Sequence, residues 1–99
     1  MTNDELYALV PIGSENAKPL GYFKNVTGLS GRAIRNRFMM LALSDKIVCN
    51  HRGGYFIADD PEDLEVESKI LNSYILKLLR RKYRVDKARE RFYMKRMEV

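Results

Sequence analysis

The chain has few of the residues that carry most enzyme and metal chemistry. Its 99 residues include one cysteine, one histidine and no tryptophan. A single cysteine cannot form a disulfide within the chain, which fits a reducing compartment. Zinc sites are built mainly from cysteine and histidine, and Cys49 with His51 supplies at most half of one, so we expect no metal. Cys49 is more simply a small buried residue on a strand. Nothing in the sequence brings a serine, the histidine and an acid together, so we also expect no enzyme and no cofactor.

Long apolar runs are missing as well. The first residues lack the basic start and the apolar stretch of a secretory signal. No segment approaches the length of a membrane span. We therefore expect a cytoplasmic protein with no membrane partner.

Acidic and basic residues are unevenly distributed along the chain. The net charge is +5 and the isoelectric point is about 9.5. Residues 1–76 carry 8 Lys/Arg and 10 Asp/Glu, whereas residues 77–99 carry 10 and 3. Within the first part, residues 18–52 hold seven basic residues and one acid, Asp45. A basic balance favours a polyanionic partner, most simply nucleic acid.

Apolar periodicity and turn residues predict a mainly α-helical chain with a small β-wing. A first helix begins near Asn3, which is a plausible cap, and Pro19 suits the first turn of a second helix. Leu20, Phe23 and Val26 mark the buried side of this second helix. The segment between the two helices, residues 14–18, is either a loop or an edge strand. The expected elements are helices at 3–10, 19–26, 30–43 and about 61–93, and strands at 46–50 and 54–58.

The third helix and the turn before it carry the strongest functional signal. Gly28 can adopt the positive φ of a tight turn, and Ser30 is a good N-cap. Three apolar residues recur at helical spacing on an inward stripe: Ile34, Phe38 and Leu41. The opposite face holds Arg32, Arg35, Asn36 and Met39, with one of Met39 and Met40 left open as a core residue. An Arg/Arg/Asn face is typical of a helix that reads the major groove, because Arg pairs with guanine and Asn with adenine.

Two strands follow this helix and are joined by the turn His51-Arg52-Gly53-Gly54. The glycines suit a tight hairpin. Arg52 lies at its tip, where it either touches DNA or is a solvated turn residue.

A long helix is expected from Pro61 onward, since Asp60 is a good cap and no glycine or proline follows Pro61. Leu64, Leu71, Leu78, Val85 and Phe92 recur every seven residues. Glu67 and Arg81 weaken the coiled-coil pattern. These apolar residues are expected to be buried against another surface, and we favour a homodimer formed through this helix. Basic residues interleave with aromatics here, so stacking on RNA or single strands is a further alternative. The possible additional nucleic-acid contacts are Lys77, Arg80, Arg81 and Arg84.

Three segments carry a family resemblance. They are Pro11-Ile12-Gly13-Ser14-Glu15-Asn16-Ala17, Gly28-Leu29-Ser30-Gly31-Arg32 with Ile34-Arg35, and Gly54-Tyr55-Phe56-Ile57. Together they resemble the winged helix-turn-helix superfamily, in particular small phage and prophage proteins and the DNA-binding domain of biotin-operon repressors. The match covers a little over half of the chain.

The resemblance implies a winged helix-turn-helix domain at 1–60. The long basic helix at 61–99, which is not part of the family pattern, is expected to serve packing, dimerisation or DNA contact. The resemblance also implies sequence-specific binding of double-stranded DNA in a bacterial host cell, for control of transcription, replication or recombination. The DNA-binding candidates are Ser30, Gly31, Arg32, Arg35, Asn36, Arg37, Met39 and Arg52. Ser30 and Gly31 would offer backbone N–H groups to a phosphate, and Arg37 would flank the reading face. The alternative is a winged-helix adaptor that docks a replication or transcription protein through the long helix.

Overall fold

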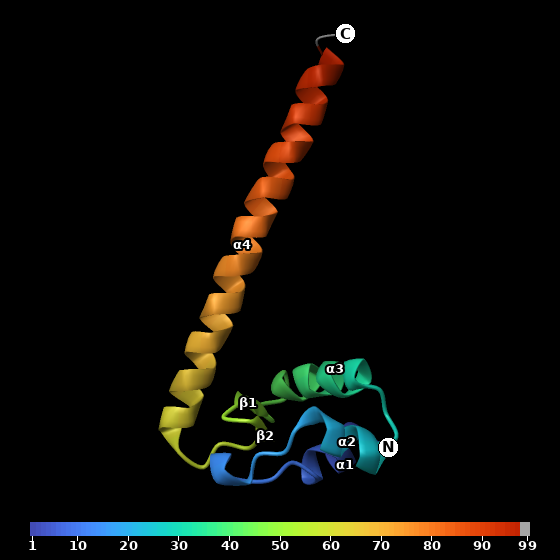
Figure 1. The fold of residues 1–99 in the computed structure, drawn as a ribbon, viewed down its shortest axis with the longest axis vertical. Coiled ribbons are helices and arrows are strands. Elements are labelled where there is room, and N and C mark those ends of the chain that lie inside the picture. The colour runs from blue at the N-terminus through green and yellow to red at the C-terminus, as the bar shows by residue number, and fades with distance from the viewer. Residues whose placement is uncertain (98–99) are drawn as a thin grey trace. The chain divides into compact units, whose positions relative to one another are not determined.

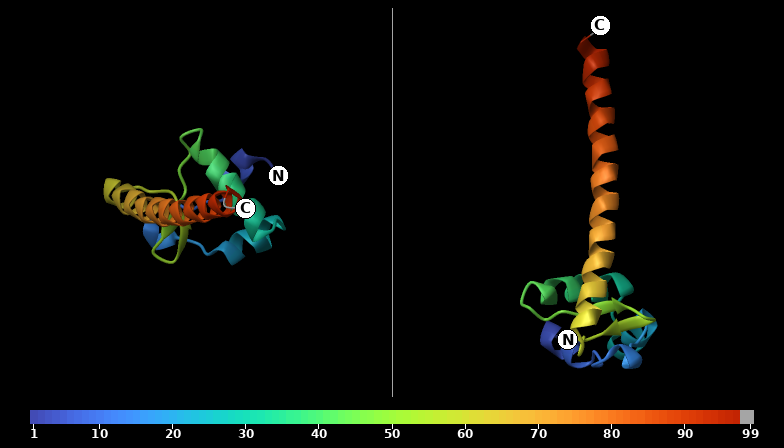
Figure 2. Two further views of the ribbon diagram at one scale, coloured as in Figure 1. Left: turned by 90° about the horizontal axis from the view of Figure 1, so that it is seen from above. Right: turned by 90° about the vertical axis from the view of Figure 1, so that its left-hand side faces the viewer.

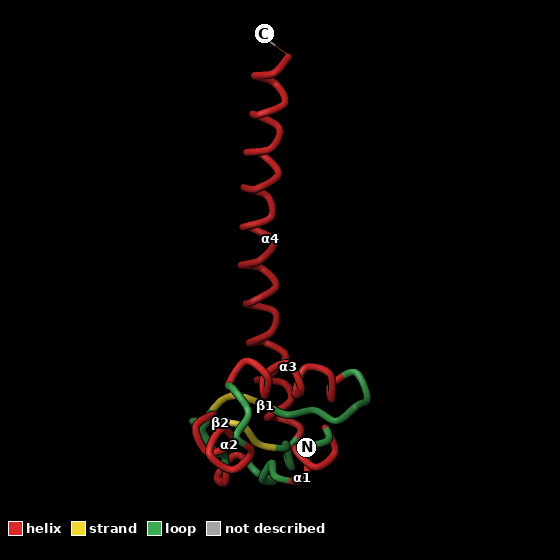
Figure 3. Tube along the Cα trace, turned by 90° about the vertical axis from the view of Figure 1, so that its right-hand side faces the viewer, coloured by secondary structure: helices red, strands yellow, loops and turns green. Residues whose placement is uncertain are grey.

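The computed structural model describes residues 1–97 and is mainly helical, with one small sheet (Figures 1 and 3). This confirms the predicted fold class. By its internal packing the chain divides into two units, Met1–Glu67 and a second that begins at Ser68. We call the first the N-terminal unit. The elements in order are α1 (Asn3–Ala8), the 3₁₀ turn η1 (Ser14–Asn16), α2 (Leu20–Thr27), α3 (Gly31–Ala42), β1 (Cys49–His51), β2 (Gly54–Phe56) and α4 (Pro61–Met97).

Side-chain caps fix where three of the helices begin. Ser30 Oγ accepts from the Ala33 N–H at 3.1 Å, and Asp60 Oδ1 accepts from the Glu62 N–H at 3.0 Å, which confirms both predicted caps. The prediction for α1 was wrong by one residue. Thr2 is its cap, because Thr2 and Glu5 form a reciprocal capping box that Asn3 cannot form.

Helices α1 and α2 both pack on α3 in the N-terminal unit, which Figure 2 shows from two further sides. Phe23 lies at the centre of the core, with its ring edge-on to the rings of Phe38 and Tyr55 at 5.6 and 5.9 Å. The predicted inner stripe of α3 is confirmed, since all three of its residues are buried. The buried core cluster comprises Leu6, Val10, Phe23, Ile34, Phe38, Leu41 and Tyr55.

One expectation about the core was wrong, and one alternative that the sequence left open is decided. Val26 is 49% exposed, because Thr27 takes the inward place at the end of α2 and its hydroxyl donates to the Phe23 carbonyl at 2.6 Å. Met39 and Met40 are 70% and 58% exposed, so neither is a core residue. The buried neighbours of these methionines already fill the inner stripe.

The sheet is an antiparallel hairpin in which Cys49 pairs with Phe56 and His51 with Gly54. Its strands are shorter than predicted. The segment before α2 contributes the turn η1, together with a single bridge from Lys18 to Tyr55 in place of an edge strand. A Cβ atom at Gly54 would lie 2.4 Å from the Lys18 carbonyl oxygen. Glycine is therefore what lets this segment pass beside β2.

Candidate nucleic-acid interface

The turn between α2 and α3 has the geometry that the sequence predicts. Gly28 has φ +74°, and its N–H donates to the Lys24 carbonyl at 2.9 Å, which closes α2. The next N–H, from Leu29, donates to Thr27 Oγ1 at 3.1 Å. These contacts fix the turn, so α3 begins at a defined point directly after Ser30.

The outward face of α3 is open in the N-terminal unit. Arg32, Arg35, Asn36 and Met39 are all exposed and follow the i, i+3, i+4, i+7 spacing of one helix side. Among residues 1–97, no carboxylate lies within salt-bridge distance of Arg32 or Arg35. Both guanidinium groups therefore keep their donors for an external acceptor.

Arg35 lies close enough to Tyr55 of β2 to influence its hydroxyl. Burial raises the pKa of Tyr55, and the positive charge of Arg35 opposes that rise. Phe38, one turn further along α3, packs against Tyr55 with the ring centres 5.1 Å apart, so the middle of α3 lies beside β2.

The start of α3 offers backbone donors. The first N–H groups of any α-helix have no carbonyl four residues earlier to bond. In α3 the Ser30 hydroxyl satisfies the N–H of Ala33, and Ile34 donates to the Ser30 carbonyl. The N–H groups of Gly31 and Arg32 lie before these positions, where the helix dipole favours an anion.

Arg37 is held within the chain. It is half-buried, and its guanidinium donates to the carbonyl of Met1 at 2.6 Å. The structure thus places Arg37 beside the outward face with one donor engaged. Its predicted contact with DNA stays a prediction.

Arg52 occupies the hairpin tip and is exposed. Arg52 has φ +55° and Gly53 has φ +93°, so both central residues of the turn are left-handed. This is the pattern of the two-residue turns that match strand twist, and they ordinarily use Asn or Gly at the first position. An arginine here costs roughly 1–2 kcal/mol of backbone strain.

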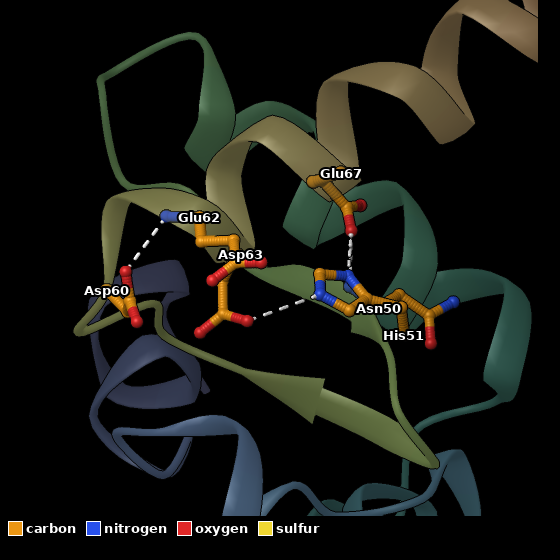
Figure 4. Close-up of polar contacts among 6 residues, drawn as sticks. All are labelled: Asn50, His51, Asp60, Glu62, Asp63 and Glu67. Atoms are coloured by element: carbon orange, nitrogen blue, oxygen red, sulfur yellow. Dashed lines mark hydrogen bonds and ion pairs between the residues drawn. The ribbon is translucent and has the colours of Figure 1, made fainter.

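The structure brings together three residues that the sequence analysis left apart (Figure 4). His51 Nδ1 lies 2.7 Å from Glu67 Oε2, and His51 Nε2 lies 3.7 Å from Asp63 Oδ1. Glu67 Oε2 also accepts the backbone N–H of Asn50 at 3.1 Å. The His51 and Asp63 side chains are only 8% and 6% exposed. The contacts tie the hairpin to the first two turns of α4.

A signal for this cluster exists in the sequence. Asp63 and Glu67 are four apart, so they share a helix face, and Glu67 interrupts the apolar heptad. Neither fact names His51 as the partner. Cys49, two residues before His51 on β1, is fully buried as predicted. Burial, together with the nearby carboxylates of Glu67 and Asp63, raises the pKa of its thiol to about 11.

The four candidates on α4 are also exposed and share one side of that helix. Lys77, Arg80, Arg81 and Arg84 again follow the i, i+3, i+4, i+7 spacing. Two tyrosines of the helix have a lysine over their rings, Lys77 at 5.9 Å from Tyr74 and Lys87 at 5.6 Å from Tyr83. These rings already have a cation as a neighbour on their own helix.

Within residues 1–97, no helix combines the length and apolarity needed to cross a membrane. Comparison of the chain with protein-family models, with curated proteins and with solved structures finds no match.

Proposed function

We propose that this protein binds double-stranded DNA in a sequence-specific manner, as a small winged helix-turn-helix regulator acting inside a bacterial host cell. One observation carries the proposal. The outward face of α3 presents Arg32, Arg35 and Asn36 side by side, exposed and without an acidic partner in the N-terminal unit. Arginine and asparagine are the side chains that make bidentate contacts with guanine and adenine.

Each further element of the N-terminal unit has a role in this proposal. The N–H groups of Ser30 and Gly31, with that of Arg32 beside them, hold a phosphate at the start of α3, and Arg52 reaches the backbone or the minor groove from the hairpin tip. Phosphate contacts fix the register of the protein on the duplex, and the α3 side chains then read the bases. The basic side of α4 adds affinity without sequence preference.

Selection from a random duplex library followed by a test of Arg35→Ala examines this proposal. On the selected site we expect Arg35→Ala to lose about 1–3 kcal/mol of binding free energy and to relax the preference at one base pair. Lys24→Ala is the matched control, because Lys24 is an exposed base on α2, outside the α3 face. It should leave the base preference unchanged. Equal site preference of Arg35→Ala and the unaltered protein would refute the role of Arg35.

The exposed apolar side chains of α4 favour a second candidate, a protein adaptor that docks a partner through this helix. The library selection separates the two. An adaptor would enrich no common site, whereas a DNA reader would enrich one.

A further inference from the structure

The apolar stripe of α4 is exposed along its whole length. Leu64, Leu71, Leu78, Val85 and Phe92 have exposed fractions between 46% and 72%, and Ile75 adds 53% between them. A soluble chain rarely leaves so long an apolar surface uncovered. The stripe is therefore a contact surface for another molecule.

The opposite side of α4 is mixed, since the exposed apolar side chains of Leu76 and Tyr83 lie there among polar and basic residues. Ser73, Lys77, Arg80 and Arg84 lie on it, about half a helical turn from the stripe. The heptad residues therefore form one continuous apolar stripe, whereas the opposite side alternates apolar with basic residues.

The charge distribution along α4 indicates which molecule covers the apolar stripe and in which direction the covering helix runs. Residues 61–76 hold four acids and one base, net −3, whereas residues 77–97 hold ten bases and two acids, net +8. The two acids of the basic segment are already paired along the helix, Asp86 with Lys82 at 2.7 Å and Glu90 with Lys87 at 3.4 Å. Eight bases in this segment have no acidic counterpart in it.

These charges exclude one arrangement of two such helices and favour the other. A parallel, in-register pair would place the two net +8 segments side by side, where like charges repel. An antiparallel pair places each net +8 segment beside the net −3 segment of the other copy. The apolar residues repeat every seven positions from 64 to 92, so the stripe spans both the acidic and the basic segment. Two such stripes can therefore pack on each other in either a parallel or an antiparallel arrangement.

We propose that α4 is a self-association surface, on which a second copy of this chain binds through the apolar stripe with its helix running antiparallel. Two exposed acids at the start of α4, Glu62 and Glu65, face the basic end of the other copy. The other two acids, Asp63 and Glu67, keep their contacts with His51 and do not contact the other copy. The proposal does not depend on DNA binding, and its test contains no DNA.

The oligomeric state is tested first with the full chain, by sedimentation velocity at tens of micromolar. We expect a dimer, and we expect Leu78→Glu to halve the mass, since Leu78 is central in the stripe and 62% exposed in the single chain. Ser73→Glu adds the same charge on the opposite side of the same helix and should stay dimeric. A monomeric unaltered protein, or equal effects of the two variants, would overturn the proposal.

The direction is tested by cross-linking with S68C and E90C, which are 22 residues and about 33 Å apart on the helix. Cys49 gives little background, because it is buried and its thiol pKa is about 11. With a short bis-maleimide, an antiparallel pair cross-links only in a mixture of the two variants, as the S68C–E90C species. Cross-linking of S68C alone and of E90C alone would show a parallel pair and overturn the proposal.

Discussion

At the scale of single residues, His51 is the contact that joins the hairpin to α4. Its imidazole lies between two carboxylates in a site that excludes most water. Removing the ring would take away the 2.7 Å contact with Glu67 Oε2 and the imidazole nitrogen that lies 3.7 Å from the buried Asp63 carboxylate. A buried carboxylate that has lost its partner is far less stable than a solvated one.

We therefore expect His51→Ala to lower the free energy of unfolding by roughly 3 kcal/mol. Asn50→Ala is the matched control, since the Asn50 side chain is exposed and only its backbone N–H contacts Glu67. Urea denaturation of the three proteins measures both effects. An equally small loss for both variants would show that the cluster does not stabilise the fold.

Arg52 carries a conformational cost that its predicted function would explain. Asparagine tolerates a positive φ far better than arginine does, so Arg52→Asn should raise the free energy of unfolding by about 1 kcal/mol. The same change removes a phosphate contact, so it should weaken DNA binding and reduce the salt dependence by about one phosphate. Arg52→Ala should lose the contact without the gain in stability. Undiminished DNA binding by Arg52→Asn would leave Arg52 as a solvated turn residue.

At the scale of elements, α3 could be predicted in detail because its signals are local. A helical apolar period, a serine cap and a glycine at positive φ all lie within one short stretch, and the structure confirms each of them. The outward face follows from the inward one by geometry alone. The exposure of Arg32, Arg35, Asn36 and Met39 could therefore be predicted from the sequence, whereas their binding role remains a proposal.

Features that depend on distant residues could not be predicted. The sequence gives no reason to pair His51 with Asp63 and Glu67, because a strand and a helix meet there only after folding. Thr27 is half-buried and its hydroxyl donates to the Phe23 carbonyl, whereas Val26 is exposed, an order that hydropathy does not predict. The bridges from Ile12 to Ile57 and from Lys18 to Tyr55 join the hairpin to residues far away in the sequence, which a local pattern does not indicate.

Alanine substitutions of Gly54 and Gly21 test how closely the segment before α2 approaches β2. Gly54→Ala should lower the free energy of unfolding by about 1–3 kcal/mol, because the new Cβ would meet the Lys18 carbonyl oxygen. Gly21→Ala should raise it by about 0.5–1 kcal/mol, because Gly21 lies in α2 with nothing within 4 Å of a new Cβ. Thermal unfolding compares the two. Similar stabilities would mean that Lys18 does not pass as closely to β2 as the structure has it.

At the scale of the whole molecule, the distribution of basic residues separates sequence preference from general affinity for polyanions. The basic residues of the N-terminal unit are few and lie mainly between 18 and 52, whereas the larger excess belongs to α4 beyond residue 76. Sequence preference should therefore depend on α3, while general affinity for polyanions should depend on α4 as well. Variants of α3 should therefore change the sequence preference, whereas variants of α4 should weaken DNA binding without changing that preference.

The most direct test of the DNA-binding proposal is to measure duplex binding at a series of salt concentrations. The full chain is titrated against a labelled random-sequence duplex, and binding is measured by fluorescence anisotropy. We expect the logarithm of the association constant to fall linearly with the logarithm of salt concentration, with a slope of roughly −0.9 for each phosphate contacted and several phosphates in total. No binding even at low salt would contradict the proposed function and would leave a protein adaptor as the better account.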